Sequence, residues 1–190
     1  MKTFKQLILL FTISIFSFSC DSNDKGVVDS NDKGVGMNTW EGVKNLKFHL
    51  GTEDPIKTVM EFDKADREKD YEKMRSMMTD STTFTGANGI TRSVDEFFDR
   101  RKEMDSIWES IGASYTWEST AMFSVDLAPG EGGELVHNYF DGTYTEGDKV
   151  NNFRGMEMWY VVDGKVVRVS SYWQDIQDEE DNDPDEKDEE

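Results

Sequence analysis

The side chains best suited to acid–base chemistry lie in the C-terminal third of the chain. His137 titrates near neutral pH, and Asp141 and Asp175 are carboxyl groups that can accept or release a proton. Arg154 can bind a carboxylate through two parallel hydrogen bonds. Two interpretations of Arg154 stay open, a buried ion pair with Asp141 or Asp175 and a clamp for a ligand carboxylate. His137 is likewise either a general base or a structural histidine.

Two predicted hairpins position these side chains. Asp163-Gly164 separates two runs rich in β-branched and aromatic residues, and a type I′ turn needs positive φ at both of its central residues. A two-residue loop there predicts four cross-strand pairs: Tyr160 with Val167, Met158 with Val169, Met156 with Ser171, and Arg154 with Trp173. A second loop at Gly147-Asp148 predicts three more: His137 with Met158, Tyr139 with Met156, and Asp141 with Arg154.

One face of these hairpins is predicted to line a small-molecule pocket, because such sites combine an apolar wall with a few converging polar groups. The candidate catalytic residues on it are His137, Asp141 and Asp175, and the candidate ligand-binding residues are Tyr139, Arg154, Met156, Met158, Tyr160, Ser171 and Trp173. The opposite face is predicted to be solvated or to contact a second copy of the chain. It holds Phe153, Glu157, Trp159, Val161, Val166, Arg168, Ser170 and Tyr172.

Helical signals come before the long strands. Asp54-Pro55 predicts the start of a first helix, Asp70 can cap a second short one, and a capping box at Ser93 starts a third that ends at Gly112. Period-two patterns and turn residues predict strands at 81–84, 113–127, 134–146, 152–162 and 165–175. The order predicts an α+β fold, with three N-terminal helices packed on a curved, mainly antiparallel sheet.

This order, with the terminal hairpin Trp159-Tyr160-Val161-Val162-Asp163-Gly164-Lys165-Val166-Val167-Arg168, resembles the nuclear transport factor 2-like superfamily, particularly its SnoaL-like and ketosteroid-isomerase-like members. The resemblance covers roughly residues 54–176. It implies a cone in which helices and a bent sheet enclose an apolar pocket, often in dimers formed through the sheet. Members include isomerases, cyclases, dehydratases and proteins without catalysis. Where isomerase-like members carry a catalytic Asp on the early strand, this chain has Thr82-Thr83-Phe84-Thr85-Gly86.

The N-terminal segment predicts export and attachment to a membrane. Lys2 and Lys5 precede an apolar run at 7–18, which is too short for a spanning helix and is typical of a secretory signal. Ser19-Cys20 resembles the lipidation site of a bacterial lipoprotein, and an ordinary signal peptide is the alternative. The predicted division is a lipoprotein signal peptide at 1–19, a flexible tether with a tandem repeat at 20–52, the nuclear transport factor 2-like domain at 53–176 and a disordered acidic tail at 177–190.

Composition argues against several classes of partner and cofactor. The net charge is −19, and nucleic-acid binding needs clustered Lys and Arg that this chain does not have. The single cysteine, Cys20, allows no intrachain disulfide, and the two histidines make no metal motif, so we predict no metal or cofactor.

We therefore predict a binding domain, tethered to the bacterial cell envelope, for a small apolar molecule with a polar end. One alternative is a SnoaL-like isomerase, cyclase or dehydratase that uses acid–base chemistry. The other is a non-catalytic structural or dimerisation module. The predicted partners are the small molecule, the membrane through lipidated Cys20, and a second copy through the sheet.

Overall fold

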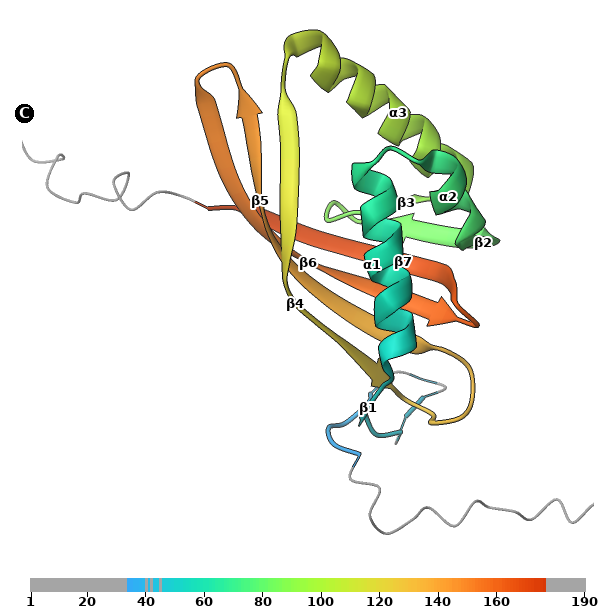
Figure 1. The fold of residues 1–190 in the computed structure, drawn as a ribbon. Helices are drawn as coiled ribbons and strands as arrows, with labels where there is room; N and C mark the ends of the chain where they lie inside the picture. The colour runs from blue at the N-terminus through green and yellow to red at the C-terminus, as the bar shows by residue number, and fades with distance from the viewer. Residues whose placement is uncertain (1–33, 40, 42, 45, 177–190) are drawn as a thin grey trace, which may run out of the picture. The chain divides into compact units, whose positions relative to one another are not determined.

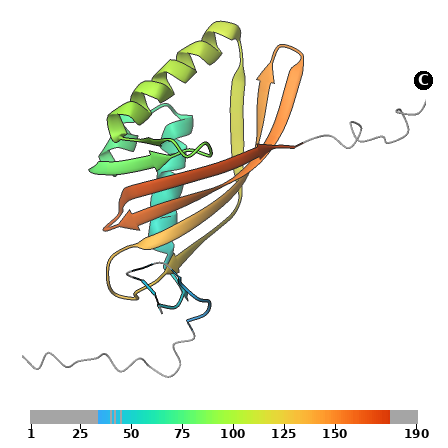
Figure 2. The same ribbon diagram turned by 180° about the vertical axis from the view of Figure 1, so that it is seen from behind.

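The computed structural model describes residues 34–39, 41, 43, 44 and 46–176. They form the predicted α+β fold, with one mixed seven-stranded sheet in the order β1-β4-β5-β6-β7-β2-β3. Helices α1 and α3 lie over one face of the curved sheet (Figure 1), and Figure 2 shows the sheet from its other side. The elements are β1 His49–Leu50, α1 Glu53–Arg67, α2 Tyr71–Ser76, β2 Met78–Thr85, β3 Thr91–Arg92, α3 Val94–Ile111, β4 Ser114–Asp126, β5 Glu134–Glu146, β6 Lys149–Val162 and β7 Lys165–Asp175.

The sheet is antiparallel at every strand pair except one. β2 runs parallel to β7, with Phe84 beside Val169, and β3 then pairs with β2 at the edge. β2 comes from the helical half of the chain and β7 ends the domain, so this pair joins the first elements to the last. Because Phe84 faces the helices, β2 also contributes to the core.

Part of the segment predicted as a tether carries secondary structure. His49 of β1 pairs with Asp126 of β4, and Val35 forms an isolated bridge with Phe48. The predicted signal peptide, Cys20 and the acidic tail lie outside the described residues, so their roles stay predictions. Within the described part of the chain, every helix is too short or too polar to span a bilayer.

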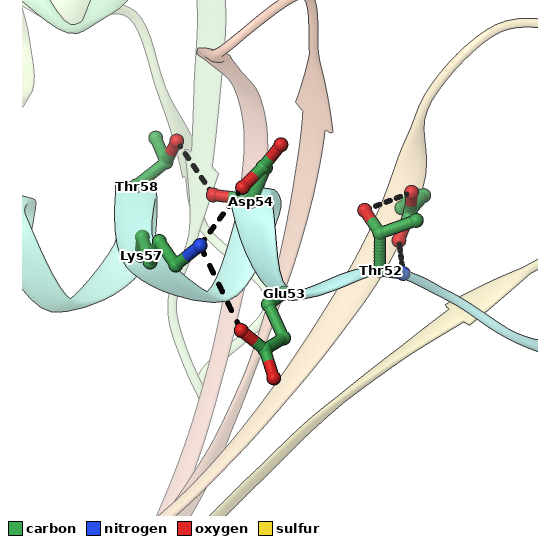
Figure 3. A network of polar contacts seen from close by, with 6 residues as sticks. Thr52, Glu53, Asp54, Lys57 and Thr58 are labelled. Atoms are coloured by element: carbon green, nitrogen blue, oxygen red, sulfur yellow. Dashed lines mark hydrogen bonds and ion pairs between the residues drawn. The ribbon is translucent and has the colours of Figure 1, made fainter.

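Glu134 of β5 holds the start of α1. Its carboxylate accepts hydrogen bonds from the backbone N–H of Thr52 at 2.6 Å and from the Thr52 hydroxyl at 2.8 Å. It also accepts one from the Ser124 hydroxyl at 2.7 Å. Burial acts to raise the pKa of Glu134, but these hydrogen bonds outweigh it and lower the pKa. Thr52 is therefore the N-cap in place of the predicted Asp54, which pairs instead with Lys57 at 3.0 Å (Figure 3).

The other predicted helix ends are confirmed. The Asp70 side chain accepts a hydrogen bond from the backbone N–H of Lys73 at 2.9 Å at the start of α2. Ser93 and Glu96 form the capping box of α3. Gly112 ends α3 with φ of 66°, a left-handed conformation that favours glycine.

The register of the β5–β6 hairpin is as predicted. His137 pairs with Met158, Tyr139 with Met156, and Asp141 with Arg154. The strand before it departs from simple alternation, because the β4–β5 register shifts between Ser119 and Ala121. The shift puts Phe123 on the face opposite to the one that carries Tyr115 and Trp117, so no single face runs along the whole of β4.

The predicted register of the last hairpin is wrong beyond its turn. Asp163 and Gly164 have the expected positive φ of 50° and 70°, and Val161 pairs with Val166. The register then shifts by one residue. Tyr160 pairs with Arg168 instead of Val167, and the displaced partners continue as Met158 with Ser170, Met156 with Tyr172 and Arg154 with Gln174. The bulge turns both Val166 and Val169 inward, where they are 0% and 4% exposed, although they lie three positions apart.

The predicted choice of buried face is also wrong. The concave face, under the helices, buries Trp159 at 5% exposure together with Phe153 and Val161. The hydrophobic pattern favours the other face because the buried one carries two polar residues, Asn138 and Glu157, directly opposite each other on β5 and β6. Helix packing decides the matter, since Phe62 of α1 meets the Trp159 ring edge to face at 5.0 Å between centroids.

Candidate functional site

A cavity of about 310 Å³ lies between α1, α3 and the concave face of the sheet. Eight of its nineteen lining residues are aromatic and six are charged, and we call it the aromatic cavity. The rings come from Phe62, Phe84, Phe97, Trp108, Tyr115, Trp117, Phe140 and Trp159. A volume of this size is at the lower end of the range for small-molecule sites, which is roughly 300–1,000 Å³.

Stacked rings fix the shape of the aromatic cavity at both ends. Phe97 of α3 stacks on Phe84 of β2 with 3.8 Å between centroids. At the other end of α3, Trp108 stacks on Tyr115 of β4 at 5.3 Å, and Tyr115 stacks on Phe153 of β6 at 4.8 Å. Both ends of α3 are thus held to the sheet by ring contacts.

Glu157 is the titratable group that faces this apolar space from the middle of the sheet. The Trp159 indole donates a hydrogen bond to its Oε2 at 3.1 Å, and the Ser171 hydroxyl donates one to its Oε1 at 3.4 Å. Burial raises the pKa of Glu157 to about 7, against the smaller opposing effect of these hydrogen bonds. Glu157 therefore populates both protonation states near neutral pH, as an acid–base group requires.

Tyr115 lines the same space and stays protonated. Burial, reinforced by the charge of Glu157, raises the pKa of Tyr115 to about 12. A phenol with such a pKa keeps its proton at neutral pH, so Tyr115 can donate a hydrogen bond to a ligand oxygen.

A charged network closes one side of the aromatic cavity. Arg101 of α3 donates from Nε to Asp66 of α1 at 2.9 Å, and the same nitrogen lies 3.9 Å from Asp105. The Tyr71 hydroxyl of α2 donates to Asp105. Burial raises the pKa of Asp66, and Arg101 opposes that rise. The network joins all three helices, and Lys69 also approaches Asp105 at 3.9 Å, so Arg101 and Lys69 share the carboxylates of Asp66 and Asp105.

Asp63 forms a second polar cluster beside the first. The Trp117 indole donates to its Oδ1 at 2.5 Å, and Arg67, one turn further along α1, pairs with its other oxygen. The Arg67 guanidinium lies over the Trp117 ring at 5.4 Å. These contacts orient Trp117 in the cavity wall.

The structure places most predicted site residues away from the aromatic cavity. His137, Tyr139, Asp141, Arg154, Met156, Met158 and Tyr160 share the other, convex face of β5 and β6. Arg154 and Asp141 do approach each other at 3.5 Å, but their side chains are 59% and 52% exposed, so they form a surface ion pair and not the buried pair that the sequence suggested. Burial lowers the pKa of His137, whose ring stacks on Phe123.

Three predicted site residues changed face with the bulge. Ser171 lines the aromatic cavity and bonds to Glu157. Trp173 and Asp175 follow it on β7 beyond the cavity, and Trp173 is 56% exposed. Of the ten predicted catalytic and ligand-binding residues, Ser171 alone lies in the cavity wall. The other nine do not line this cavity, so the structure gives no support for their acting on a ligand there.

Exposed aromatic side chains and half-buried methionines make up much of the convex face. Phe123, Tyr139 and Tyr172 are 40%, 39% and 47% exposed there, next to Met156 and Met158. Dimerisation through the sheet, which the sequence analysis suggested, stays a prediction. No cluster of three or more His, Cys, Asp or Glu side chains that could hold a metal ion occurs in the described part of the chain.

Sequence reasoning missed Glu157, Arg101 and Asp66. The available signal for Glu157 is a carboxyl group next to Trp159 on a strand face that also carries Phe153 and Val161, but a charged residue on a strand is equally typical of a solvated face. Asp66 and Arg101 are 35 positions apart in the sequence and lie on different helices. No local pattern in the sequence therefore predicts their hydrogen bond.

No family model and no curated protein sequence matches the chain. Solved structures do match it. An LEH-like epoxide hydrolase of M. tuberculosis aligns with a TM-score of 0.51 and 15% identity over 65% of this chain and 84% of that one. The β subunit of benzoate 1,2-dioxygenase from Burkholderia mallei aligns with a TM-score of 0.54 and 11% identity over 66% and 92%. IdmH from Streptomyces antibioticus, a proposed polyketide cyclase, aligns with a TM-score of 0.51 and 13% identity over 63% and 91%. At these identities the similarity shows a shared fold.

Proposed function

We propose that this chain, which has the nuclear transport factor 2-like fold, binds a small, mainly apolar molecule in the aromatic cavity and exchanges a proton with it through Glu157. The observation that carries the proposal is the position of Glu157, a carboxyl group with a pKa of about 7, in a cavity walled by aromatic rings. The names of two structures with this fold, an epoxide hydrolase and a proposed polyketide cyclase, support small-molecule chemistry.

The chemistry that suits this site is proton transfer at a carbon next to a carbonyl or similar group. Ionised Glu157 is the base that takes the proton, and protonated Glu157 returns it, so one side chain serves both steps of an isomerisation, cyclisation or dehydration. Tyr115 is placed to stabilise a negative oxygen that develops on the substrate. The aromatic rings around Glu157 lower the local polarity, which strengthens both interactions.

A binding function without catalysis is the second candidate. Both oxygens of Glu157 already accept hydrogen bonds from the protein, at 3.1 and 3.4 Å, which is the arrangement expected of a side chain that only shapes the cavity. The proton-exchange experiment described in the Discussion separates the two candidates.

The neutral fluorescent probe N-phenyl-1-naphthylamine is expected to bind in the aromatic cavity of the wild-type protein. Met104→Trp places a larger side chain at the cavity wall and is expected to weaken binding at least about tenfold, which is about 1.4 kcal/mol. Tyr139→Ser removes an exposed ring from the convex face and is the matched control, with expected affinity unchanged. Titration followed by direct excitation of the probe measures this. If Met104→Trp leaves binding intact and Tyr139→Ser removes it, the probe binds to the convex face, and the proposed cavity function fails.

We also propose that the mature domain is held at the bacterial cell envelope by lipid on Cys20. The support is the apolar run at 7–18 followed by Ser19-Cys20. Acyl chains contribute about 0.8 kcal/mol per buried CH₂, enough for several chains to anchor a domain of this size. The wild-type protein made in a bacterium is expected to enter the detergent phase of a detergent partition, and Cys20→Ser to stay in the aqueous phase. A wild-type protein found in the aqueous phase contradicts lipidation.

A further inference from the structure

Arg92 is a cationic side chain in the cavity wall. It belongs to β3, the edge strand of the sheet, and is half-buried there. In the described part of the chain no carboxylate forms an ion pair with it. Glu96 is close enough for Arg92 to contribute to lowering its pKa, but the larger effect is the pair of hydrogen bonds from Ser93. The Glu96 carboxylate is therefore engaged with the capping box.

The two other arginines that line the aromatic cavity already have carboxylate partners. Arg101 bonds to Asp66 at 2.9 Å, and Arg100 pairs with Glu103 at 2.8 Å. A half-buried guanidinium without an anion loses hydration and gains little in return. Arg92 is thus the position in the cavity wall where an incoming anion gains most.

We propose that Arg92 binds the anionic end of the ligand, which makes the ligand of the aromatic cavity a small amphipathic organic acid. This inference rests on the proposed function and names the class of molecule that the site takes. The apolar body lies against the rings, and a carboxylate or sulfonate meets the guanidinium, whose fork geometry suits two parallel hydrogen bonds to two oxygens of the anion. Thr85 and Gly86 line the same cavity, and Phe84, the partner of Arg92 on β2, supplies an apolar ring beside the guanidinium.

The sheet order limits the length of such a ligand. Glu157 lies on β6 and Arg92 on β3, with β7 and β2 between them. Three strand spacings of about 4.8 Å put the two backbones about 14 Å apart across the sheet. The pairing also offsets Arg92, which is level with Val169, by about two residues along the strands from Glu157, which is level with Ser171. The anionic group therefore lies at the opposite end of the ligand from the carbon that meets Glu157.

The overall charge of the chain does not remove this preference. The net charge of −19 repels anions at long range, but about half of it belongs to the C-terminal stretch 178–190. At physiological ionic strength the Debye length is about 8 Å, so the charges of the cavity wall itself act most strongly on a bound anion. Asp63 and Asp66 in that wall are paired with Arg67 and Arg101.

The test uses two probes that differ by one anionic group, 1-anilinonaphthalene-8-sulfonate and neutral N-phenyl-1-naphthylamine. Arg92→Gln is expected to weaken binding of the sulfonate about tenfold and to change binding of the neutral probe less than twofold. Arg92→Lys keeps the charge and is expected to recover part of the loss. Arg154→Gln removes an exposed arginine from the convex face and is the matched control, with both affinities unchanged.

The outcomes distinguish this inference from the proposed function. The inference is overturned if Arg92→Gln leaves sulfonate binding unchanged, if it weakens both probes equally while the variant keeps the wild-type unfolding midpoint, or if the wild-type protein binds the neutral probe alone. The proposed function fails instead if neither probe binds the wild-type protein, or if Met104→Trp leaves both affinities unchanged.

Discussion

Replacing Glu157 by glutamine is expected to slow exchange of deuterium from solvent into a bound ketone by at least about 100-fold. Glutamine keeps the shape of the side chain but cannot take a proton. The other two carboxyl groups in the cavity wall, Asp63 and Asp66, are paired with Arg67 and Arg101 and cannot replace it. The measurement is mass spectrometry of small cyclic and aryl ketones incubated with the protein in deuterated water.

Two residues of the convex face provide matched controls for this experiment. His137→Ala and Asp141→Asn remove the acid–base groups that the sequence suggested, and both are expected to exchange at the wild-type rate. If either control variant loses exchange while Glu157→Gln keeps it, the acid–base site lies on the convex face and the proposed role of Glu157 is wrong. If the wild-type protein binds the neutral probe but exchanges deuterium into none of the ketones, the result supports the binding function without catalysis.

The raised pKa of Glu157 adds an expected pH dependence. The exchange rate of the wild-type protein rises with pH as the base forms, and levels off above about 7. Stability changes in the opposite direction, because the folded protein holds this proton more tightly than the unfolded chain. The stabilising contribution is present below about pH 4.5 and is lost as the pH rises through about 7. Urea unfolding measures this effect. Between acidic and alkaline pH, the free energy of unfolding of the wild-type protein is expected to fall by about 3 kcal/mol more than that of Glu157→Gln.

The second large effect is expected at Arg101. Arg101→Met is expected to lower the free energy of unfolding by about 3–5 kcal/mol, because it leaves two mostly buried carboxylates without their shared cation. Those carboxylates belong to Asp66 and Asp105, whose side chains are 20% and 9% exposed. Chemical denaturation at neutral pH measures the loss.

The neighbouring residue supplies the control for Arg101. Arg100→Met breaks an exposed pair with Glu103 and is expected to cost less than about 1 kcal/mol. Asp66→Asn in the Arg101→Met background removes one of the two carboxylates, the one that Lys69 does not approach, and is expected to restore part of the stability. A loss below 1 kcal/mol in Arg101→Met contradicts a structural role for the network.

Local signals in the sequence were enough for the three helices and the five longer strands, but not for the two-residue strands β1 and β3. Asp163-Gly164 predicted a hairpin because its turn needs two residues that tolerate positive φ, and Ser93 predicted a helix start because its side chain caps a free backbone N–H. The β5–β6 register followed from loop length. The start of α1 was missed because its stabilising carboxylate, Glu134, lies 82 residues away from Thr52.

The sequence by itself determined that His137, Asp141 and Arg154 share one sheet face and that Glu157 and Trp159 share the other. Alternation determines that a strand has two faces, and both faces here carry enough apolar side chains to form a core. Only the tertiary structure decided which one the helices cover, through the contact of Phe62 with Trp159. The bulge opposite Tyr160 then brought Ser171 into the cavity. The same burial gave Glu157 its raised pKa, a property of its surroundings that strand alternation does not encode.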